Sequence, residues 1–395
     1  MDVNKKMTNV LLLNKIAKVG LEILDEAKYL CSDSVENPDA VLVRSAAMHD
    51  MELPDSLLAI ARAGAGVNNI PIDKCTEKGI VVFNTPGANA NAVKELIVAG
   101  LLLSSRKISQ GISWAQGLKG EGDAVTKLVE KGKSQFVGPE IEGKTLGVIG
   151  LGAIGAIVAN VAVSLGMDVI GYDPYISVDA AWGLSRAVKK AKTLDEIYSK
   201  ADYITIHVPL TDETRHTICA ESIAKMKDEV RILNFARGDL VNDDDIIKAV
   251  QDGKVACYIT DFPNEKLLGI PNIVTIPHLG ASTPESEDNC AEMAARELKH
   301  YIEDGNIKNS VNFPAVSSPR TTNVRICVMH KNIPNMISQI STMLADLNFN
   351  IDHFTNKSKG NVAYSLLDID ADGINDEALQ KLTGIDGVIR VRAIQ

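Results

Sequence analysis

The chain has 395 residues, a formal net charge of −10, and 45% apolar, 23% charged but only 4% aromatic residues. This length predicts two or three domains, and the aliphatic composition favours α/β layers. The acidic balance argues against a nucleic-acid surface, no apolar run approaches a membrane span, and six scattered cysteines without a CxxC pair predict reduced thiols in the cytoplasm.

The first part of the chain alternates short apolar runs with amphipathic ones. Three runs predict buried strands: VLLLN (10–14), AVLVRS (40–45) and IVVFNTP (80–86). Two segments predict helices between them, KVGLEILDEA (18–27) and PDSLLAIARAG (54–64). This alternation indicates a parallel sheet. A long helix is predicted over 92–107, and the polar, glycine-rich stretch 111–143 is predicted to be a connection.

A second series of βα units starts at Lys144. Its predicted strands are TLGVIG (145–150), MDVIGYD (167–173), YITIHVPL (203–210), RILNFA (231–236), ACYITDF (256–262) and IVTIPHLG (273–280), with a helix over 156–166 after the first of them. This order predicts a doubly wound sheet. The amphipathic helix predicted over 286–302 then returns the chain to the first lobe, so we expect two α/β lobes with a substrate cleft between them.

The C-terminal segment follows a Pro- and Ser-rich stretch over 309–322 and reads as βαββαβ. The strands are predicted over 324–330, 351–360, 362–370 and 388–394, and the helices over 333–347 and 376–385. That order is typical of a ferredoxin-like unit. The predicted domains are therefore 1–97 with 283–315 for substrate, an inserted Rossmann lobe at 98–282 for NAD, and a regulatory or assembly domain at 320–395.

A GxGxxG loop, GVIGLGAIG, joins a predicted strand to a predicted helix at Gly150, Gly152 and Gly155. In this context the glycines allow a tight turn, close approach of a pyrophosphate, and close helix–strand packing. Asp173 ends the next strand, where an acid accepts hydrogen bonds from ribose hydroxyls and repels a 2′-phosphate. The loop therefore predicts an NAD site, and a structural turn with a strand-end acid is the alternative.

Three polar residues follow predicted strands and are candidates for chemistry. Arg237, after RILNF, can hold a carboxylate through two hydrogen bonds. His278, after IVTIP, can take a hydroxyl proton as hydride leaves carbon, and Glu265 is the nearest acid in sequence to orient it. The alternatives are a surface arginine, a structural histidine and a solvated loop acid.

Polar residues in the first lobe could bind an anionic substrate. Arg44 ends a predicted strand, Arg62 precedes a glycine-rich turn whose backbone amides at 64–67 could form an anion-binding nest, and Asn89 lies in another loop. Without further support, Arg44 and Arg62 are ordinary surface arginines.

The motifs VRSA, RAGAGVNN, FNTPGAN, GLGAIG, GYDP, NFARG, TDFPNE and PHLGAST together resemble the D-isomer-specific 2-hydroxyacid dehydrogenases over nearly the whole chain. The resemblance implies oxidation of 3-phosphoglycerate to 3-phosphooxypyruvate with NAD, the first step of phosphorylated serine synthesis. It implies that Arg237 holds the substrate carboxylate and that Glu265 and His278 form the proton-transfer dyad. The implied substrate-binding residues are Arg44, Ser45, Arg62, Gly66, Val67 and Asn89. The implied NAD-binding residues are Gly150, Gly152, Ala153, Ile154, Gly155, Asp173, His207, Val208, Pro209, Phe235, Ala236, Arg237, Asp261, His278, Leu279, Gly280 and Ala281.

The same resemblance identifies the C-terminal segment as similar to an ACT domain. It implies that His330, Asn332 and Asn350 bind L-serine as a feedback inhibitor across a pair of chains, and that the protein is a homodimer or homotetramer. Polar loop caps are the alternative for these residues. No metal site and no nucleic-acid or membrane partner is expected.

The loop with the dyad acid departs from the family's pattern, because Glu265 lies four residues after Asp261 where five is usual. Without a gap, Lys266 would occupy the acid's place; a one-residue deletion restores Glu265. Related reductases of hydroxypyruvate or glyoxylate, and non-catalytic corepressors with the same fold, are the competing functions. Arg44, Arg62 and the C-terminal unit favour the phosphorylated substrate.

Overall fold

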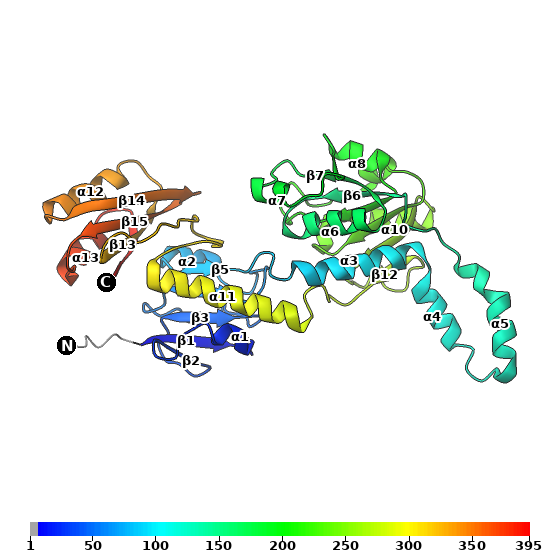
Figure 1. Ribbon diagram of the computed structural model, residues 1–395, viewed down its shortest axis with the longest axis horizontal. Helices are drawn as coiled ribbons and strands as arrows, with labels where there is room; N and C mark the ends of the chain where they lie inside the picture. The colour runs from blue at the N-terminus through cyan, green and yellow to red at the C-terminus, as the bar shows by residue number, and fades with distance from the viewer. Residues whose placement is uncertain (1–6) are drawn as a thin grey trace. The chain divides into compact units, whose positions relative to one another are not determined.

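The computed structural model describes residues 7–395, apart from the side chain of Asp179. The chain forms two compact units: a first unit that runs to Asn89 and resumes at Pro284–Gln395, and a nucleotide unit, Ala90–Thr283. The chain therefore leaves the first unit once and returns to it once, and the predicted order of a lobe interrupted by an inserted lobe is present (Figure 1).

The first unit contains a five-stranded parallel sheet in the order β2-β1-β3-β4-β5, which is one of the two common doubly wound orders. The strands are β1 (Thr8–Leu13), β2 (Tyr29–Ser32), β3 (Ala40–Val43), β4 (Ala59–Arg62) and β5 (Val81–Phe83). The helices are α1 (Lys18–Leu21), α2 (Ile72–Glu77) and α11 (Pro284–Asp304). Every residue of β3 and β5 is buried, as expected for strands covered on both faces.

One predicted element of this sheet was wrong. The segment 54–64 contains the strand β4 and no helix, and Ala59, Ile60 and Ala61 are fully buried in it. The strand β2 and the helix α2 were not predicted. A short apolar run is compatible both with a strand buried on both faces and with one side of a helix. Its periodicity therefore could not distinguish the two structures.

The nucleotide unit contains a seven-stranded sheet in the order β12-β11-β10-β9-β6-β7-β8. All of its neighbouring strands are parallel. The strands are β6 (Thr145–Ile149), β7 (Asp168–Tyr172), β8 (Lys189–Lys190), β9 (Tyr203–Ile206), β10 (Val230–Asn234), β11 (Val255–Thr260) and β12 (Ile273–Thr275). The order starting from β6 is the Rossmann order with one strand added, so the predicted Rossmann lobe is confirmed.

Helices flank this sheet, and two of them form a hairpin. The α-helices are α3 (Ala90–Ser105), α4 (Ile108–Gln116), α5 (Val125–Gly132), α6 (Ala153–Ser164), α7 (Val178–Trp182), α8 (Leu194–Lys200), α9 (Ala220–Ala224) and α10 (Asp243–Gln251). Short 3-10 turns lie at Gly122–Ala124, Lys133–Phe136 and Gly238–Leu240. The stretch 111–143, predicted to be a connection, thus forms the α4–α5 hairpin, which extends away from the rest of this unit in Figure 1.

The C-terminal part is the predicted βαββαβ unit. It consists of β13 (Val324–Lys331), α12 (Met336–Asp346), β14 (Asn350–Lys359), β15 (Val362–Asp370), α13 (Asp376–Thr383) and β16 (Val388–Ile394). The sheet is antiparallel, in the order β14-β15-β13-β16, and this is the ferredoxin-like arrangement.

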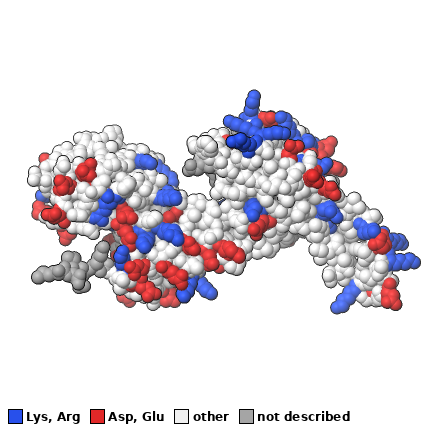
Figure 2. Space-filling view, viewed as in Figure 1, with Lys and Arg blue, Asp and Glu red and all other residues white. Residues whose placement is uncertain are grey.

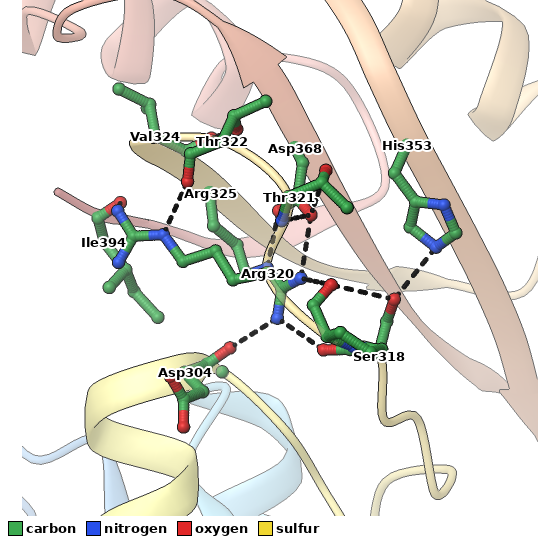
Figure 3. A network of polar contacts seen from close by, with 12 residues as sticks. Asp304, Ser318, Arg320, Thr321, Thr322, Val324, Arg325, His353, Asp368 and Ile394 are labelled. Carbon is green, nitrogen blue, oxygen red and sulfur yellow. Dashed lines mark hydrogen bonds and ion pairs between the residues drawn. The ribbon is translucent and has the colours of Figure 1, made fainter.

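A buried ion pair lies within the C-terminal part, and its arginine also bonds to the end of α11 (Figure 3). Arg325 on β13 and Asp368 on β15 are 0% and 1% exposed, with Nε and Oδ1 2.6 Å apart. Arg325 also donates to the backbone oxygens of Asp304, Ser318 and Pro319. Burial alone would raise the pKa of Asp368, but hydrogen bonds from Arg325 and Thr321 outweigh it and hold that pKa below its usual range.

No helix within residues 7–395 combines the length and the apolar character that crossing a membrane would require.

Candidate functional site

The glycine-rich loop has the geometry that its sequence predicts. Gly150 follows β6 with φ at +91°, and a Cβ there would lie 2.7 Å from the carbonyl oxygen of His207. A Cβ on Gly155 would lie 1.9 Å from the oxygen of Gly150, so only glycine permits this packing of α6 on the loop. A Cβ on Gly152 would meet no atom within 4 Å, so space is open where a ligand can approach the backbone.

The first turn of α6 is available to an anion. Gly152 is its N-cap and provides no side-chain cap, and Gly152 and Ala153 are exposed, with Ile154 half-buried. Uncapped backbone N–H groups and the positive end of the helix dipole favour a phosphate at such a position. These residues fit the pyrophosphate of a dinucleotide.

Asp173 lies directly after β7, as predicted, and is tied to the loop. Its Oδ2 accepts from the Leu151 backbone N–H and its Oδ1 accepts from the Tyr175 N–H, both at 2.8 Å. The carboxylate is half-buried and each oxygen retains a lone pair. It can therefore accept ribose hydroxyls while these two backbone bonds fix its orientation.

The carboxyl end of β9 supplies His207, Val208 and Pro209 beside the loop. The Val208 Cγ1 would lie 3.0 Å from a Cβ on Gly150. Burial lowers the pKa of His207 to about 3, and its Nε2 lies 3.0 Å from the Thr205 hydroxyl. His207 is therefore neutral near pH 7 and adds no positive charge to the nucleotide site.

Arg237 is exposed at the end of β10, and a buried asparagine shapes its backbone. Asn234 is 0% exposed, and its Nδ2 donates to the Arg237 carbonyl oxygen at 2.8 Å. The Asn234 Oδ1 accepts from the Ala236 N–H at 3.2 Å, and Phe235 is buried between them in sequence. Asn234 was not predicted as a site residue; an amide that ends an otherwise apolar strand was the available signal.

Asp261, at the end of β11, is 1% exposed, and its Oδ1 is buried with no hydrogen-bond partner in the described structure. Burial raises the pKa of this carboxyl, while the charges of His278 and Arg237 and the Gly280 backbone amide oppose the rise. An unpaired buried oxygen is costly, so an N–H donor from a ligand would be stabilised here. The role of Asp261 in binding NAD stays a prediction.

His278, in the exposed stretch after β12, packs against Phe262. Their ring centroids are 4.8 Å apart with planes tilted by 53°. Ser282 N–H donates to the Leu279 oxygen, so 279–282 form a turn that contains the predicted residues Gly280 and Ala281. Phe262 was not predicted to act at this position.

Glu265 lies in the exposed loop after β11, and within residues 7–395 no hydrogen bond or ion pair joins it to His278. Its neighbour Lys266 is engaged elsewhere, with Nζ 2.8 and 3.0 Å from the two carboxylate oxygens of Asp244. The structure therefore brings Arg237 and His278 close enough to Asp261 for their charges to interact.

In the first unit, the two arginines are linked. Arg62 Nε donates to the Arg44 carbonyl oxygen at 2.9 Å, and an Arg44 guanidinium nitrogen lies 2.7 Å from a carboxylate oxygen of Glu287. The Ser45 N–H donates to Asn14 Oδ1 at 2.9 Å. These contacts place Arg44, Ser45 and Arg62 together at the carboxyl ends of β3 and β4.

The glycine turn after β4 is held by residues that follow β5. Asn84 Nδ2 donates to the Ala65 oxygen at 2.6 Å, and the Thr85 N–H donates to the Gly64 oxygen at 3.1 Å. The side-chain oxygens Thr85 Oγ1 and Asn89 Oδ1 are buried and have no hydrogen-bond partner in the described structure. The turn at 64–67 and the side chain of Asn89 were predicted; Asn84 and Thr85, which also lie in FNTPGAN, were not.

The three predicted effector residues lie at opposite ends of the C-terminal sheet. His330, 2% exposed, contacts Asn356 and Ser365, and Asn332 Nδ2 donates to the Gly360 oxygen at 3.0 Å. Asn350 begins β14 and pairs with Asp370, whereas His330 pairs with Ala363 at the other end of β15. Seven residues of strand separate the two ends by about 23 Å.

A lysine-lined cavity of about 590 Å³ lies at the other edge of the nucleotide sheet, where β6 and β7 begin at Thr145 and Asp168. Figure 2 shows basic residues gathered over α8 and β7. Lys189, Lys200 and Lys227 are each paired with a carboxylate, so most of this charge is compensated. Among the described residues, no group of three or more His, Cys, Asp or Glu side chains could hold a metal ion.

Similar proteins show the family to which the chain belongs. Residues 98–280 match the model "D-isomer specific 2-hydroxyacid dehydrogenase, NAD binding domain". The chain is 30% identical to D-3-phosphoglycerate dehydrogenase 1 of Saccharomyces cerevisiae over 401 residues, covering 91% of this chain and 81% of the yeast protein. The chain belongs to the D-isomer-specific 2-hydroxyacid dehydrogenase family.

Other members of the family are similar over much of the chain. The D-3-phosphoglycerate dehydrogenase of Methanocaldococcus jannaschii is 33% identical, over 85% of this chain and 65% of its own length. The chain therefore spans about two thirds of that relative. An NAD⁺-bound 3-phosphoglycerate dehydrogenase of Entamoeba histolytica has a TM-score of 0.61 and 26% identity, covering 78% of this chain and 99% of that one. The family match confirms the prediction that the cofactor is NAD.

Proposed function

We propose that this chain is an NAD-dependent D-3-phosphoglycerate dehydrogenase that oxidises 3-phospho-D-glycerate to 3-phosphooxypyruvate. In the reaction the C2–H bond breaks with its electron pair as hydride, and the C2 hydroxyl loses a proton. The observation that carries the proposal is the grouping of Arg237, Asp261 and His278 at strand ends of the unit that holds the dinucleotide loop. The relatives of that name support the choice of substrate.

The nucleotide unit would hold NAD through its loop and two carboxylates. The first-turn amides of α6 would bind the pyrophosphate, Asp173 would accept from the ribose hydroxyls, and the unpaired Oδ1 of Asp261 would accept an amide N–H. When bound, NAD supplies the hydride acceptor. The acid at Asp173 repels a 2′-phosphate, so NAD is preferred to NADP.

Arginine side chains would supply the positive charge that binds the substrate. Arg237 binds the carboxylate through its planar guanidinium and polarises the C2 oxygen. Arg44, Ser45, Arg62, Gly66, Val67 and Asn89 take the other anionic end. Since Arg44 is paired with Glu287, the phosphate would have to displace that carboxylate from Arg44 or bind Arg44 together with it. A chain of net charge −10 needs such local cations to attract a trianionic substrate.

His278 would act as the general base and Glu265 as its orienting acid. Packing against Phe262 limits the rotation of the imidazole that would accept the proton. Glu265 would reach His278 only if the exposed loop after β11 changes conformation. The ion pair of Lys266 with Asp244 supports Glu265, and not Lys266, as the residue free to do so.

The substrate assignment is tested by measuring NADH consumption with phosphooxypyruvate, hydroxypyruvate and 2-oxoglutarate in parallel. We expect kcat/KM for phosphooxypyruvate to exceed that for hydroxypyruvate by at least about 100-fold, because the phosphate adds charged hydrogen bonds. A preference for hydroxypyruvate would assign the chain to a reductase of the same family. No turnover of any of the three would favour a non-catalytic NAD-binding protein.

We further propose feedback inhibition by L-serine through an ACT-like C-terminal part. Because His330 and Asn350 lie at opposite ends of one sheet, a single chain cannot hold one serine with both, and two chains are needed. Titrating serine into initial-rate assays tests this. Unchanged rates at millimolar serine would contradict it.

The α4–α5 hairpin supports a homo-oligomer. Neither helix contains a buried residue, and Ile108 and Ile112 are 41% and 57% exposed. Trp114 and Phe136 pack within the hairpin with centroids 5.4 Å apart, so the hairpin is ordered although little covers it. Sedimentation of the hairpin variant Ile112→Glu should show a smaller species than the unaltered chain if this face lies between subunits.

A further inference from the structure

A short segment after α11 completes the edge of the first sheet. Ser310 pairs with Phe83 in an antiparallel bridge, and the Val311 N–H donates to the Val82 oxygen at 2.9 Å. Asn312, 7% exposed, accepts from the Val82 N–H and donates to the Ile80 oxygen, both at 2.9 Å. The segment Asn309–Asn312, here called the edge segment, therefore covers β5, which would otherwise be an open edge.

The edge segment also fixes the position of Asn84. The Asn84 N–H donates to the Asn309 oxygen at 3.3 Å, and its side-chain Nδ2 donates to the Ala65 oxygen at 2.6 Å. The Ala65 carbonyl and the Gly66 N–H belong to one planar trans peptide and point in opposite directions. By holding that carbonyl, Asn84 sets the direction of the Gly66 N–H, one of the amides proposed to bind substrate.

The C-terminal part also contacts the edge segment. Lys359, the last residue of β14, donates from Nζ to the Ser310 and Val311 oxygens at 3.1 and 2.9 Å. The next two residues form the turn that Asn332 holds, through its side chain to the Gly360 oxygen and its N–H to the Asn361 oxygen. Asn332, a proposed effector-binding residue, thus bonds to the residue that directly follows Lys359.

We propose that Asn84 is a positioning residue for the substrate-binding turn, and that Lys359 transmits the state of the C-terminal part to it through the edge segment. This inference rests on the proposed function, since it assigns the Gly66 amide to substrate binding. A ligand that takes the Asn332 amide from Gly360 releases the β14–β15 turn. Lys359 then loosens its hold on the edge segment, and the Ala65–Gly66 peptide loses its orientation.

The kinetic test is a double-mutant cycle with a matched control. Asn84→Ala should raise KM for 3-phosphoglycerate about five-fold, the effect of one lost hydrogen bond, and leave kcat and KM for NAD nearly unchanged. Lys359→Ala should act in the same direction, and Lys359→Arg, which keeps the donors, should restore KM. Lys357→Ala removes the same charge from an exposed position of β14 and should change nothing.

The double variant Asn84→Ala/Lys359→Ala decides whether the two residues act in series. If Lys359 works through Asn84, KM of the double variant equals that of Asn84→Ala alone. If the two increases multiply, the residues act independently and the proposal is wrong. Equal losses in Lys357→Ala and Lys359→Ala would reduce the effect to net charge and also overturn it.

Amide hydrogen exchange tests the same relay without substrate. Lys359→Ala should speed exchange in peptides covering 309–312 and in those covering 63–70, whereas Lys357→Ala should speed neither. Faster exchange at 309–312 alone, or no change in either, contradicts the relay. A chain that does not oxidise 3-phosphoglycerate would disprove the proposed function and leave this measurement interpretable.

Discussion

Glu297 is a carboxyl group buried on α11 at 5% exposure, and its Oε2 has no hydrogen-bond partner in the described structure. Its Oε1 accepts from the Asn309 amide, at the start of the edge segment. Burial raises the pKa of Glu297 from 4.5 to about 7, and the Asn309 hydrogen bond and the Lys308 charge offset only part of that rise. The protonated form is therefore favoured in the folded chain.

This carboxyl makes stability depend on pH in a defined window. Below pH 4.5 it is protonated in both states, and between pH 4.5 and about 7 the unfolded chain releases the proton first. Stability therefore falls as pH rises through that window and stays lower above it, by about 3 kcal/mol. Glu297→Gln should abolish this fall, so denaturant unfolding should show the variant gaining on the unaltered chain from pH 5 to pH 8. If the stabilities of Glu297→Gln and the unaltered chain changed with pH in parallel, Glu297 would not be the group responsible. The same gain in stability in Glu292→Gln, at a more exposed position of α11, would also contradict the prediction.

Glu265 and Lys266 are adjacent candidates for one role and carry opposite charges. Glu265→Gln should lower kcat about ten-fold or more, because the proposed dyad loses the carboxylate that orients the imidazole of His278. Lys266→Ala should break only the exposed ion pair with Asp244 and leave kcat unchanged. The reverse pattern in steady-state rates would show that no residue is deleted from the loop.

At the scale of elements, the glycines of the loop before α6 have different roles, one in ligand binding and one in folding. Gly152→Ala places its Cβ in open space, so thermal unfolding should be unchanged while the Kd for NAD rises at least about ten-fold. Gly155→Ala forces a Cβ against the Gly150 oxygen and should cost about 2 kcal/mol of stability or more. Calorimetric titration and unfolding of both variants distinguish the two roles. Equal losses of stability in the two variants would mean that Gly152, like Gly155, is needed for folding, and would contradict a specific role in ligand binding.

The sequence predicted elements well where periodicity and neighbours agreed. The long helix α11 and the βαββαβ unit were correct because their apolar periods extend over many residues. β4 was mistaken for a helix because LLAIA is too short to show a period and its strand is buried on both faces. β2, half exposed with only four residues, gave no pattern to detect.

Site residues were predictable where a strand end fixed their place. Arg237, Asp261 and His278 each follow a strand of one parallel sheet, so their sequence positions alone put them at one edge. Asn84 donates to a backbone oxygen of another loop, and that partner comes close only in the folded chain. Asn234 donates to the Arg237 oxygen three residues further on, a contact that depends on the turn after β10. The relation of Glu265 to His278 depends on the conformation of an exposed loop, which no spacing determines.

At the scale of the molecule, the C-terminal part shares an apolar core with the five-stranded sheet of the same unit. Cys327, Met329, Tyr364 and Leu366 pack in one cluster with residues of the five-stranded sheet and α11. Arg392 donates to the Tyr301 and Ile302 oxygens and lies over the Tyr301 ring. A separate domain at 320–395 stays a prediction. Because of these contacts, we expect the C-terminal part to unfold together with the five-stranded sheet and α11.

The buried Arg325–Asp368 pair allows a test of that joint unfolding. Asp368→Asn leaves a buried guanidinium without its counter-charge and should cost about 3 kcal/mol. The whole first unit should lose stability together in denaturant, with one transition. The pKa of Asp368 lies below its usual range, so this contribution is complete above about pH 4 and is lost only as pH falls further. Asp370→Asn, exposed two residues later, should have little effect.

The edge segment has a consequence for synthesis of the chain. It bonds to β5 across 230 residues, and the whole nucleotide unit is made between them. At about 5–20 residues per second, a ribosome needs roughly ten to fifty seconds to bridge that interval. During this time the nascent first sheet carries an uncovered edge strand, the kind of surface on which neighbouring chains pair. We therefore expect the yield of folded protein to depend on elongation rate and on chaperones that shield this strand.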